Sequence, residues 1–260
     1  MNNKKSAKEL ILNARGQLIG RYGQAILVVI MVGLINLFLG SFADYAYTGS
    51  FSSYLFKILI LIIIDLLLGV LSFGRARYFL NLVRGVQGLS PADLFYGIKN
   101  NVDKTIGLQA VFTMVFAVVA IPEAYVSFFI VRSEFDYILI TSVFSLVSSV
   151  LLFVVRLFFG LSFYILADHP EYGVIEILKE SNRLMTGNRL RLVSVGLRMI
   201  PFLLLGFLAF GFGLLWPAAI YSTVLANLYL DVIGEKPYDP LADRKPESES
   251  EPDPKSLLFK

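Results

Sequence analysis

The sequence predicts an all-α, polytopic membrane protein with six transmembrane helices. Hydrophobic residues make up 56% of the 260-residue chain and charged residues 17%, whereas soluble domains average about 45 to 50% and 25%. Apolar runs of nearly 20 residues recur along the chain, and about 20 such residues in a helix cross the hydrocarbon layer. Lys and Arg also gather in alternate connecting segments, as in membrane proteins with several spans.

Six apolar segments carry this prediction. Their approximate bounds are 25–42, 54–74, 106–124, 138–160, 193–211 and 215–233. Between the last two lies GFGLLWP, in which Gly211, Gly213 and Pro217 favour a tight reversal. We therefore expect a hairpin turn at this point. One long kinked helix is the alternative, and it would put the C-terminal tail on the other side of the membrane.

The positions of Lys and Arg predict the orientation. Five, five, four and five of these residues lie in 1–24, 75–105, 168–191 and 234–260, whereas none and one lie in 43–53 and 125–137. Because cytoplasmic loops are enriched in Lys and Arg, both termini are predicted to be cytoplasmic.

An amphipathic segment precedes each odd-numbered span, so we expect three hairpins that are each entered through a cytoplasmic helix. Ser6 and Glu9 have the spacing of a capping box, and Ser90 begins a second helix signal. In 170–187 an apolar stripe lies opposite charged residues, and Gly187 is placed to end that helix. We expect these helices to rest on the inner membrane surface or to close the base of the bundle. A docking surface for a soluble partner is the alternative.

The two ends of the chain differ from the membrane domain at 25–233. Residues 1–24 are predicted to hold a cytoplasmic amphipathic helix. From residue 234 on, the chain has five of its ten prolines and the run ESESEPDP. Such a composition buries little apolar surface, so 234–260 is predicted to be a disordered cytoplasmic tail.

The pattern F-G-x-x-x-Y-x-L occurs twice, 86 positions apart, as FGRARYFL and FGLSFYIL. Glycine lets a neighbouring helix approach, and tyrosine suits the membrane interface. We therefore expect a packing and anchoring motif at the ends of two equivalent helices, without chemistry of its own. Its residues are Phe73, Gly74, Tyr78, Phe159, Gly160 and Tyr164.

Longer stretches resemble a known family. ILADHPEYGVIEILKESNRLMTGNRLRL at 165–192 and GFLAFGFGLLWPAAIYSTVLANLYLDV at 206–232 are similar to a bacterial family of six-span membrane proteins, catalogued as domain of unknown function 975. NARGQLIGRYGQAI and DLFYGI extend the resemblance to about residues 5–235. Asn182-Arg183 and Pro217-Ala218 depart from it. The resemblance implies a bacterial plasma membrane and brings no activity, ligand or cofactor.

Asp65, near the middle of the second span, is the residue most suggestive of function. A charge there costs about 2.5 to 3.5 kcal/mol on insertion scales, so it normally has a partner. The repeat offset puts Arg156 about 7.5 Å along the helix axis from Asp65. We predict an intramembrane ion pair between them. The alternatives are a proton or ion site, a protonated Asp65, or an Arg156 that reaches the interface alone.

The sequence gives no sign of catalysis. Asp168, His169 and Glu171 cluster around Pro170, where a helix cap and a cytoplasmic turn are expected rather than a metal or acid–base site. With no cysteine and one histidine, thiolate and histidine-rich metal sites are excluded. Motifs of metalloproteases, serine hydrolases and phosphate-binding loops are missing. We predict no enzyme, no cofactor and no nucleic-acid partner.

Two functions remain open. The first is a non-enzymatic envelope accessory or scaffold protein with a cytoplasmic or membrane protein partner. The second is a small transporter or lipid-handling channel that uses Asp65. A polar cavity reaching Asp65 would favour transport, and a dry bundle with Asp65 paired would favour the scaffold.

Overall fold

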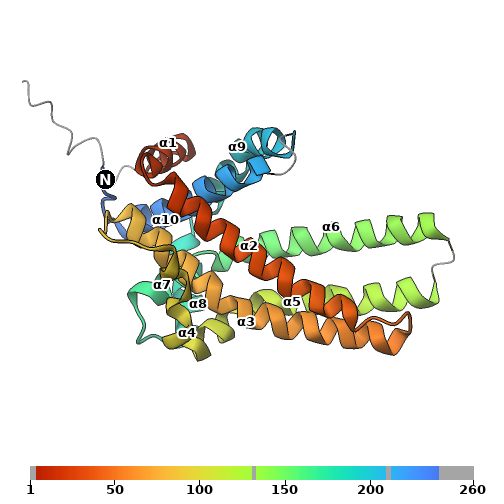
Figure 1. Ribbon diagram of the computed structural model, residues 1–260. Helices are drawn as coiled ribbons and strands as arrows, with labels where there is room; N and C mark the ends of the chain where they lie inside the picture. The colour runs from red at the N-terminus through yellow and green to blue at the C-terminus, as the bar shows by residue number, and fades with distance from the viewer. Residues whose placement is uncertain (1–3, 131–132, 209–211, 240–260) are drawn as a thin grey trace, which may run out of the picture.

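The computed structural model describes residues 4–130, 133–208 and 212–239, and these are helical with short connections (Figure 1). The expected all-α class is thereby confirmed. Each predicted span coincides with a helix, usually a longer one. The elements are α1 (Ala7–Leu18), α2 (Tyr22–Tyr45), α3 (Phe51–Val83), η1 (Pro91–Phe95), α4 (Tyr96–Lys99), α5 (Val102–Phe129), α6 (Glu134–Phe159), α7 (Ser162–Asp168), α8 (Val174–Met185), α9 (Arg189–Leu208), η2 (Phe212–Leu214) and α10 (Leu215–Ile233).

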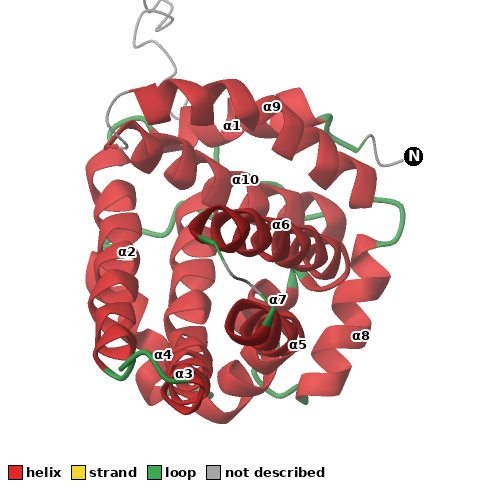
Figure 2. Cartoon of the chain, turned by 90° about the vertical axis from the view of Figure 1, so that its right-hand side faces the viewer, coloured by secondary structure: helices red, strands yellow, loops and turns green. Residues whose placement is uncertain are grey.

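The helices form two regions. In Figure 1, α2, α3, α5 and α6 extend to the right, away from a body made of α1, α4, α7 to α10 and the C-terminal part of α3. Figure 2 looks along α5 and α6, and α8 and α9 run across that direction. The main apolar core lies in the body, with α1, α3, α7 and α10 as large contributors. The long helices instead expose many large apolar side chains, as lipid-facing helices do.

Local sequence signals explain the amphipathic helices of the body. At the start of α1, Ser6 Oγ accepts a hydrogen bond from the Glu9 amide at 3.3 Å, and Glu9 Oε2 accepts one from the Ser6 amide at 2.6 Å. These reciprocal bonds satisfy two backbone donors that a helix start leaves unpaired. In α8, Ile177 and Met185 are fully buried. Gly187 follows with φ +78°, where glycine is favoured, so the chain reverses into α9.

Within the described ranges, five helices are long and apolar enough to cross a membrane. They are α2, α3, α5, the stretch Glu134–Asp168 that includes α6 and α7, and α9. The sixth predicted span, α10, is not among them, so the six-span prediction is confirmed only in part. Eleven of the nineteen residues of α10 are buried, and these include the polar Thr223 and Asn227. α10 is therefore a major part of the core of the body.

The turn between α9 and α10 lies beside the start of α2. The ring of Trp216, at the start of α10, packs edge-on against that of Tyr22, with centroids 5.8 Å apart. If the hairpin crossed the bilayer while α2 began at the cytoplasmic surface, as predicted, its tip would lie about 30 Å from the start of α2. The expectation of three equivalent hairpins is therefore not confirmed for the last one.

The hairpin turn itself is tight. A Cβ atom on Gly206 would lie 2.8 Å from the carbonyl carbon of Gly213. The end of α9 and the segment before α10 therefore meet through glycine backbones. Pro217 is buried in the first turn of α10, where the missing amide donor is not needed. Gly211 lies outside the described residues.

The doubled motif occupies two different environments. Gly74 lies within α3, and a Cβ atom there would lie 1.7 Å from the Leu94 carbonyl oxygen, so η1 packs directly on its backbone. Gly160 follows α6, and a Cβ atom there would instead meet the Arg156 carbonyl oxygen of its own helix at 2.5 Å. The two motif copies were predicted to lie at the ends of equivalent helices, and this is wrong. α3 continues through the first copy of the motif, whereas the second copy contains the break between α6 and α7.

The motif's aromatic residues belong to the core rather than to a membrane interface. Tyr78 is 0% exposed and Tyr164 is 5% exposed, so the predicted interfacial role is wrong. Tyr164 donates a hydrogen bond to the Ser222 carbonyl at 3.4 Å. Phe73 is buried, whereas Phe159 is half-buried. These rings are enclosed because the body surrounds this end of α3 on several sides.

The first residues after position 234, predicted to be disordered, are packed on the body. The Tyr238 amide donates to the Val83 carbonyl at 2.8 Å, and the Tyr238 carbonyl accepts from Gln17 Nε2 at 3.1 Å. Its ring lies against Gly85, where a Cβ atom would come within 2.6 Å of it. The segment after α10 is thus packed on α1 and α3, while 240–260 lies outside the described residues.

Gly74→Ala should destabilise the fold by about 1 to 3 kcal/mol, because the added methyl group must displace the η1 backbone. Gly16→Ala is the matched control, since a Cβ atom there meets nothing within 4 Å, and alanine favours α1 by up to about 1 kcal/mol. Thermal unfolding of the purified protein in detergent measures both. Equal unfolding temperatures for the two variants would contradict the close approach.

Candidate functional site

One guanidinium group joins three chain segments at the end of the body. Arg84 Nη1 and Nη2 donate to Asp168 Oδ1 and Oδ2 at 2.6 and 2.8 Å. Its Nε and Nη2 donate to Glu235 Oε1 and Oε2 at 2.8 and 2.7 Å. Arg84 follows α3, Asp168 ends α7 and Glu235 follows α10. This Arg84 cluster therefore closes the body between residues that are 84 and 151 positions apart in the chain.

The Arg84 cluster is only partly accessible to solvent. The side chains of Arg84 and Asp168 are 25% and 17% exposed, and Tyr229 donates a further hydrogen bond to Asp168 Oδ2 at 2.9 Å. The hydrogen bonds from Asp168, and then those from Glu235, raise the pKa of the Arg84 guanidinium. Bidentate pairs of this kind are among the stronger polar contacts in proteins.

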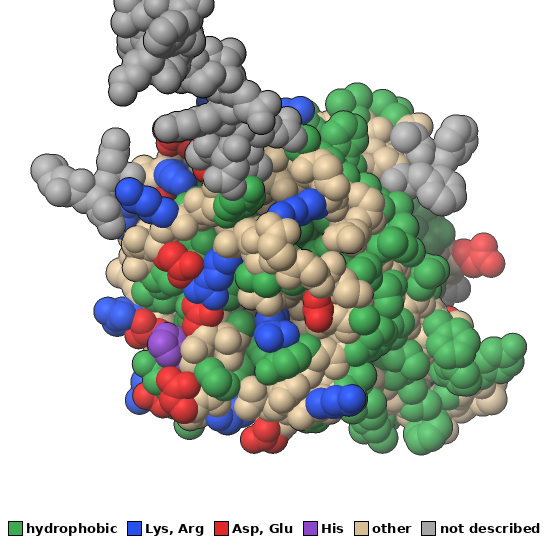
Figure 3. Space-filling model, turned by 60° about the vertical axis from the view of Figure 1, so that its left-hand side comes forward, with side chains coloured by type: hydrophobic (Ala, Val, Ile, Leu, Met, Phe, Trp, Pro, Cys, Tyr) green, Lys and Arg blue, Asp and Glu red, His purple; other side chains and the backbone are tan. Residues whose placement is uncertain are grey.

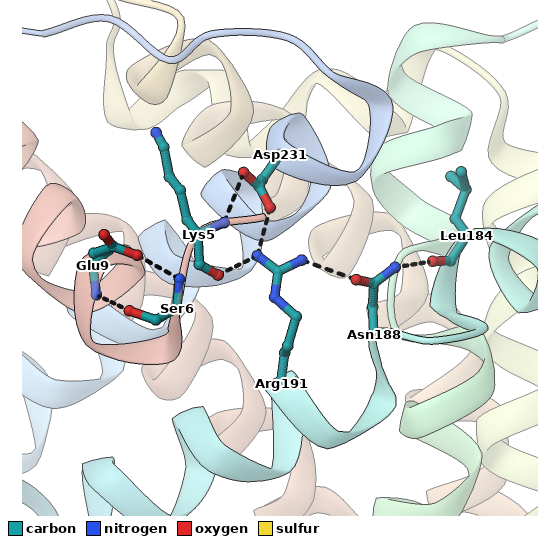
Figure 4. A network of polar contacts seen from close by, with 7 residues as sticks. All are labelled: Lys5, Ser6, Glu9, Leu184, Asn188, Arg191 and Asp231. Carbon is teal, nitrogen blue, oxygen red and sulfur yellow. Dashed lines mark hydrogen bonds and ion pairs between the residues drawn. The ribbon is translucent and has the colours of Figure 1, made fainter. Parts of the chain in front are cut away.

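A second cluster surrounds Arg191 at the start of α9 (Figure 4). Its Nη2 donates to Asp231 Oδ2 at 2.5 Å and to the Lys5 carbonyl at 2.6 Å, and its Nη1 donates to Asn188 Oδ1 at 2.9 Å. Asn188 Nδ2 then donates to the Leu184 carbonyl at 2.8 Å. The Arg191 and Asp231 side chains are only 15% and 10% exposed. The Arg191 cluster thus links the N-terminal segment, α8, α9 and α10.

A pair of amides attaches α1 to α10. Asn227 Nδ2 donates to Gln17 Oε1 at 2.7 Å, and Gln17 Nε2 donates to Asn227 Oδ1 at 3.2 Å. Both side chains are buried, at 1% and 5% exposure. Because buried amides are costly unless they are hydrogen-bonded, this reciprocal pair fixes where α1 lies along α10.

Asp65 is bound by α5, and its predicted pair with Arg156 is wrong. Asp65 Oδ2 accepts hydrogen bonds from Gln109 Nε2 at 3.0 Å and from Thr113 Oγ1 at 2.5 Å. Gly69, one turn further along α3, allows this approach, since a Cβ atom there would lie 2.5 Å from Gln109 Cβ. Arg156 is exposed on α6. The prediction fails because α5 packs against α3 as well as α6.

The turn after α7 has structural contacts. His169 Nδ1 lies 3.2 Å from Glu171 Oε1 at the surface, and its ring stacks on Tyr172 with centroids 4.6 Å apart. The Pro170 carbonyl accepts a hydrogen bond from Lys104. In the part of the chain that the structure describes, no group of three His, Cys, Asp or Glu residues could hold a metal ion.

Comparison with known proteins gives one match. The sequence model of the family described as "Protein of unknown function (DUF975)" matches residues 1–236. The chain belongs to the DUF975 family. No curated protein and no solved structure matches it. All residues of the Arg84 and Arg191 clusters lie within the part of this DUF975 protein that the family covers, and Tyr238 lies beyond it.

The sequence did not predict several residues that form the polar contacts of this DUF975 protein. Gln109 and Thr113 carry a usable signal, because two polar residues four positions apart share one face of an apolar helix. Arg84 and Glu235 carry none, since both are ordinary charged residues just after helix ends. What joins them is the return of α10 to the end of α3, which local sequence does not specify.

The two arginine clusters of the DUF975 protein are suited to holding helix ends together. Arg84 directs its Nε, Nη1 and Nη2 at carboxylates, and Arg191 directs its Nη1 and Nη2 at an amide, a carbonyl and a carboxylate. These donors are therefore engaged within the chain, whereas the buried Nε of Arg191 has no hydrogen-bond partner among the described residues. In this arrangement the clusters fix geometry, and they offer little hydrogen-bonding capacity to a ligand.

Arg84→Ala should lower the free energy of unfolding by about 3 kcal/mol, because it leaves two carboxylates without their cation. Arg84→Lys should recover only part of this loss, since lysine cannot form two bidentate pairs. Arg183→Ala is the control: Arg183 forms an ion pair with Glu180, but its side chain is 74% exposed, so a much smaller loss than that of Arg84→Ala is expected. Thermal unfolding in detergent measures all three, and equal losses for Arg84→Ala and Arg183→Ala would contradict the structural role.

Proposed function

We propose that the chain is a non-enzymatic accessory or scaffold protein of the bacterial plasma membrane, and that α6 packs against a helix of another membrane protein. The proposal rests on the exposure of α6. None of its 26 residues is buried, although the helix is long enough to cross the hydrocarbon layer. α6 adds little to the protein's own core, so its length is best explained by contacts outside this chain.

The composition of α6 supports a helical partner. Thr141, Ser145 and Ser149 recur every four residues, and small residues at that spacing let membrane helices approach closely. The Ser149 hydroxyl donates to the Ser145 carbonyl at 2.8 Å, and Thr141 donates to the Tyr137 carbonyl at 2.8 Å. Because these hydroxyl donors are used within the helix, the face can pack against an apolar neighbour.

The proposed topology has both termini in the cytoplasm. Lys5 and Gln17 contact Asp231 and Asn227, which supports both ends of the chain lying on one side. Charged side chains gather at that end of the molecule (Figure 3), and an excess of Lys and Arg marks the cytoplasmic side. In this proposal α2, α3, α5 and α6 with α7 cross the membrane. α9 and α10 enter from the cytoplasmic side and return to it, in place of the fifth and sixth crossings.

A transporter or lipid-handling channel is the second candidate. Asp65 favours it, because an intramembrane carboxylate that accepts two hydrogen bonds can serve as a proton or ion site. Against it, both donors come from the adjacent helix α5, and this geometry needs no passing ion to satisfy the carboxylate. The scaffold is therefore the better-supported candidate.

The topology can be tested with single cysteines, because the chain has none of its own. Ser52→Cys and Glu134→Cys should react with an impermeant maleimide added outside intact cells, since both positions lie at the far ends of the long helices. Gln87→Cys and Leu214→Cys should react only after lysis. Labelling of Leu214→Cys from outside would show six full crossings and would contradict the returning hairpin.

The scaffold can be tested by photo-crosslinking in intact membranes. A benzophenone amino acid at Ser145 should form a discrete protein adduct, because a partner helix packs there. The same group at Leu37, which is 74% exposed on α2, should form only lipid adducts. If both positions gave lipid adducts alone and Asp65→Asn abolished an ion flux of the reconstituted protein, the scaffold would be wrong and transport would be supported.

A further inference from the structure

A cavity of about 360 Å³ lies between α1, α9 and the start of α10, within the range of about 300 to 1,000 Å³ that is usual for small-molecule sites. Its walls are mostly apolar and include Phe202, Leu205, Trp216 and Ile220. Arg15 is the charged residue among those that line it. An apolar cavity with one cationic wall fits an amphipathic molecule with a negative end.

The surface around the cavity is apolar and exposed. Leu205 and Trp216, which line it, are 65% and 53% exposed. Next to them on α9, Leu204 and Leu208 are 63% and 77% exposed. Such a continuous apolar surface is stable in hydrocarbon and unfavourable in water. A molecule that enters the cavity therefore comes most readily from the surrounding bilayer.

Two arginines lie on the helices that form the cavity. Arg15 lines it from α1, and Arg198 precedes Phe202 by four residues and Leu205 by seven, on the same face of α9. Neither side chain has an ion pair or hydrogen bond to the described residues, unlike Arg84 and Arg191. Both are exposed. Their charge is thus available to an anion at the membrane surface.

We propose that this cavity binds an anionic glycerophospholipid of the bilayer, with one acyl chain in the cavity and the phosphate between Arg15 and Arg198. Guanidinium groups match the oxygens of a phosphate through paired, charge-assisted hydrogen bonds. A zwitterionic lipid adds an ammonium group, which the two arginines repel. The Tyr22 and Trp216 rings lie at the same level and suit the headgroup boundary. This binding site is independent of the proposed partner of α6.

Trp216 provides the test, because it is the single tryptophan of the chain and lines the cavity. The full chain is reconstituted in phosphatidylcholine vesicles that contain a small fraction of lipid with brominated acyl chains, which quench tryptophan on contact. Brominated phosphatidylglycerol should quench Trp216 at a lower mole fraction than brominated phosphatidylcholine. Arg15→Gln should reduce this preference about fivefold, from roughly 1 kcal/mol per basic residue near a membrane surface. Arg198→Gln should reduce it similarly.

Lys8→Gln is the matched control, because Lys8 lies on the same face of α1, seven residues before Arg15, and does not line the cavity. It should keep the preference for phosphatidylglycerol. Equal quenching by the two lipids in the parent protein would overturn the proposal. The proposal would also be overturned if Lys8→Gln and Arg15→Gln reduced the preference for phosphatidylglycerol equally. That result would indicate that the preference comes from the general positive charge of the surface. Equally strong quenching by a brominated fatty acid would replace the phospholipid by a free carboxylate ligand.

Discussion

The guanidinium of Arg84 holds the ends of three helices together, because it binds Asp168 and Glu235 at the same time. This contact sets how α3, α7 and α10 end relative to one another. Once the end of α10 is fixed, its buried polar face aligns with two further partners, Gln17 and the Arg191 cluster. Each link is specific in direction and distance, so together the links oppose sliding or rotation of α10. The position of α1 and the connection from α8 to α9 therefore follow from where α10 is held.

Buried polar contacts and exposed apolar surface lie in different regions of the molecule. Its body contains the charged clusters and most of the buried side chains, whereas α6 buries none of its residues. In water this division would be unstable, because the exposed apolar surface of the long helices is large. In a bilayer the hydrocarbon covers that surface, and the helices need only satisfy their own backbone hydrogen bonds. Asp65 is an ionisable residue within this region, and Gln109 and Thr113 satisfy it from the neighbouring helix.

Contacts with lipid and with another protein would use different sides of this arrangement. The cavity beside Arg15 lies in the body, where α9 passes across the direction of the long helices. The face of α6 with Thr141, Ser145 and Ser149 lies in the extended region. A lipid held at the body would stabilise the position of α9, while leaving α6 available. Binding of a lipid at the body and packing of a partner helix on α6 are therefore independent of each other.

The sequence by itself determined the class of the protein and the position of every long helix, because apolar length and the placement of charges are local properties. It also indicated the capping box at Ser6 and Glu9 and the close approach at Gly74. The environment of α10 and the path of its hairpin were decided only by the tertiary structure. Trp216 meets Tyr22, and Arg84 meets Asp168 and Glu235, across large separations in the chain. The repeat suggested Arg156 as the partner of Asp65, but similar sequence motifs do not ensure similar neighbours in the fold. α5 packs against both α3 and α6, and its Gln109 and Thr113 side chains bind Asp65 instead.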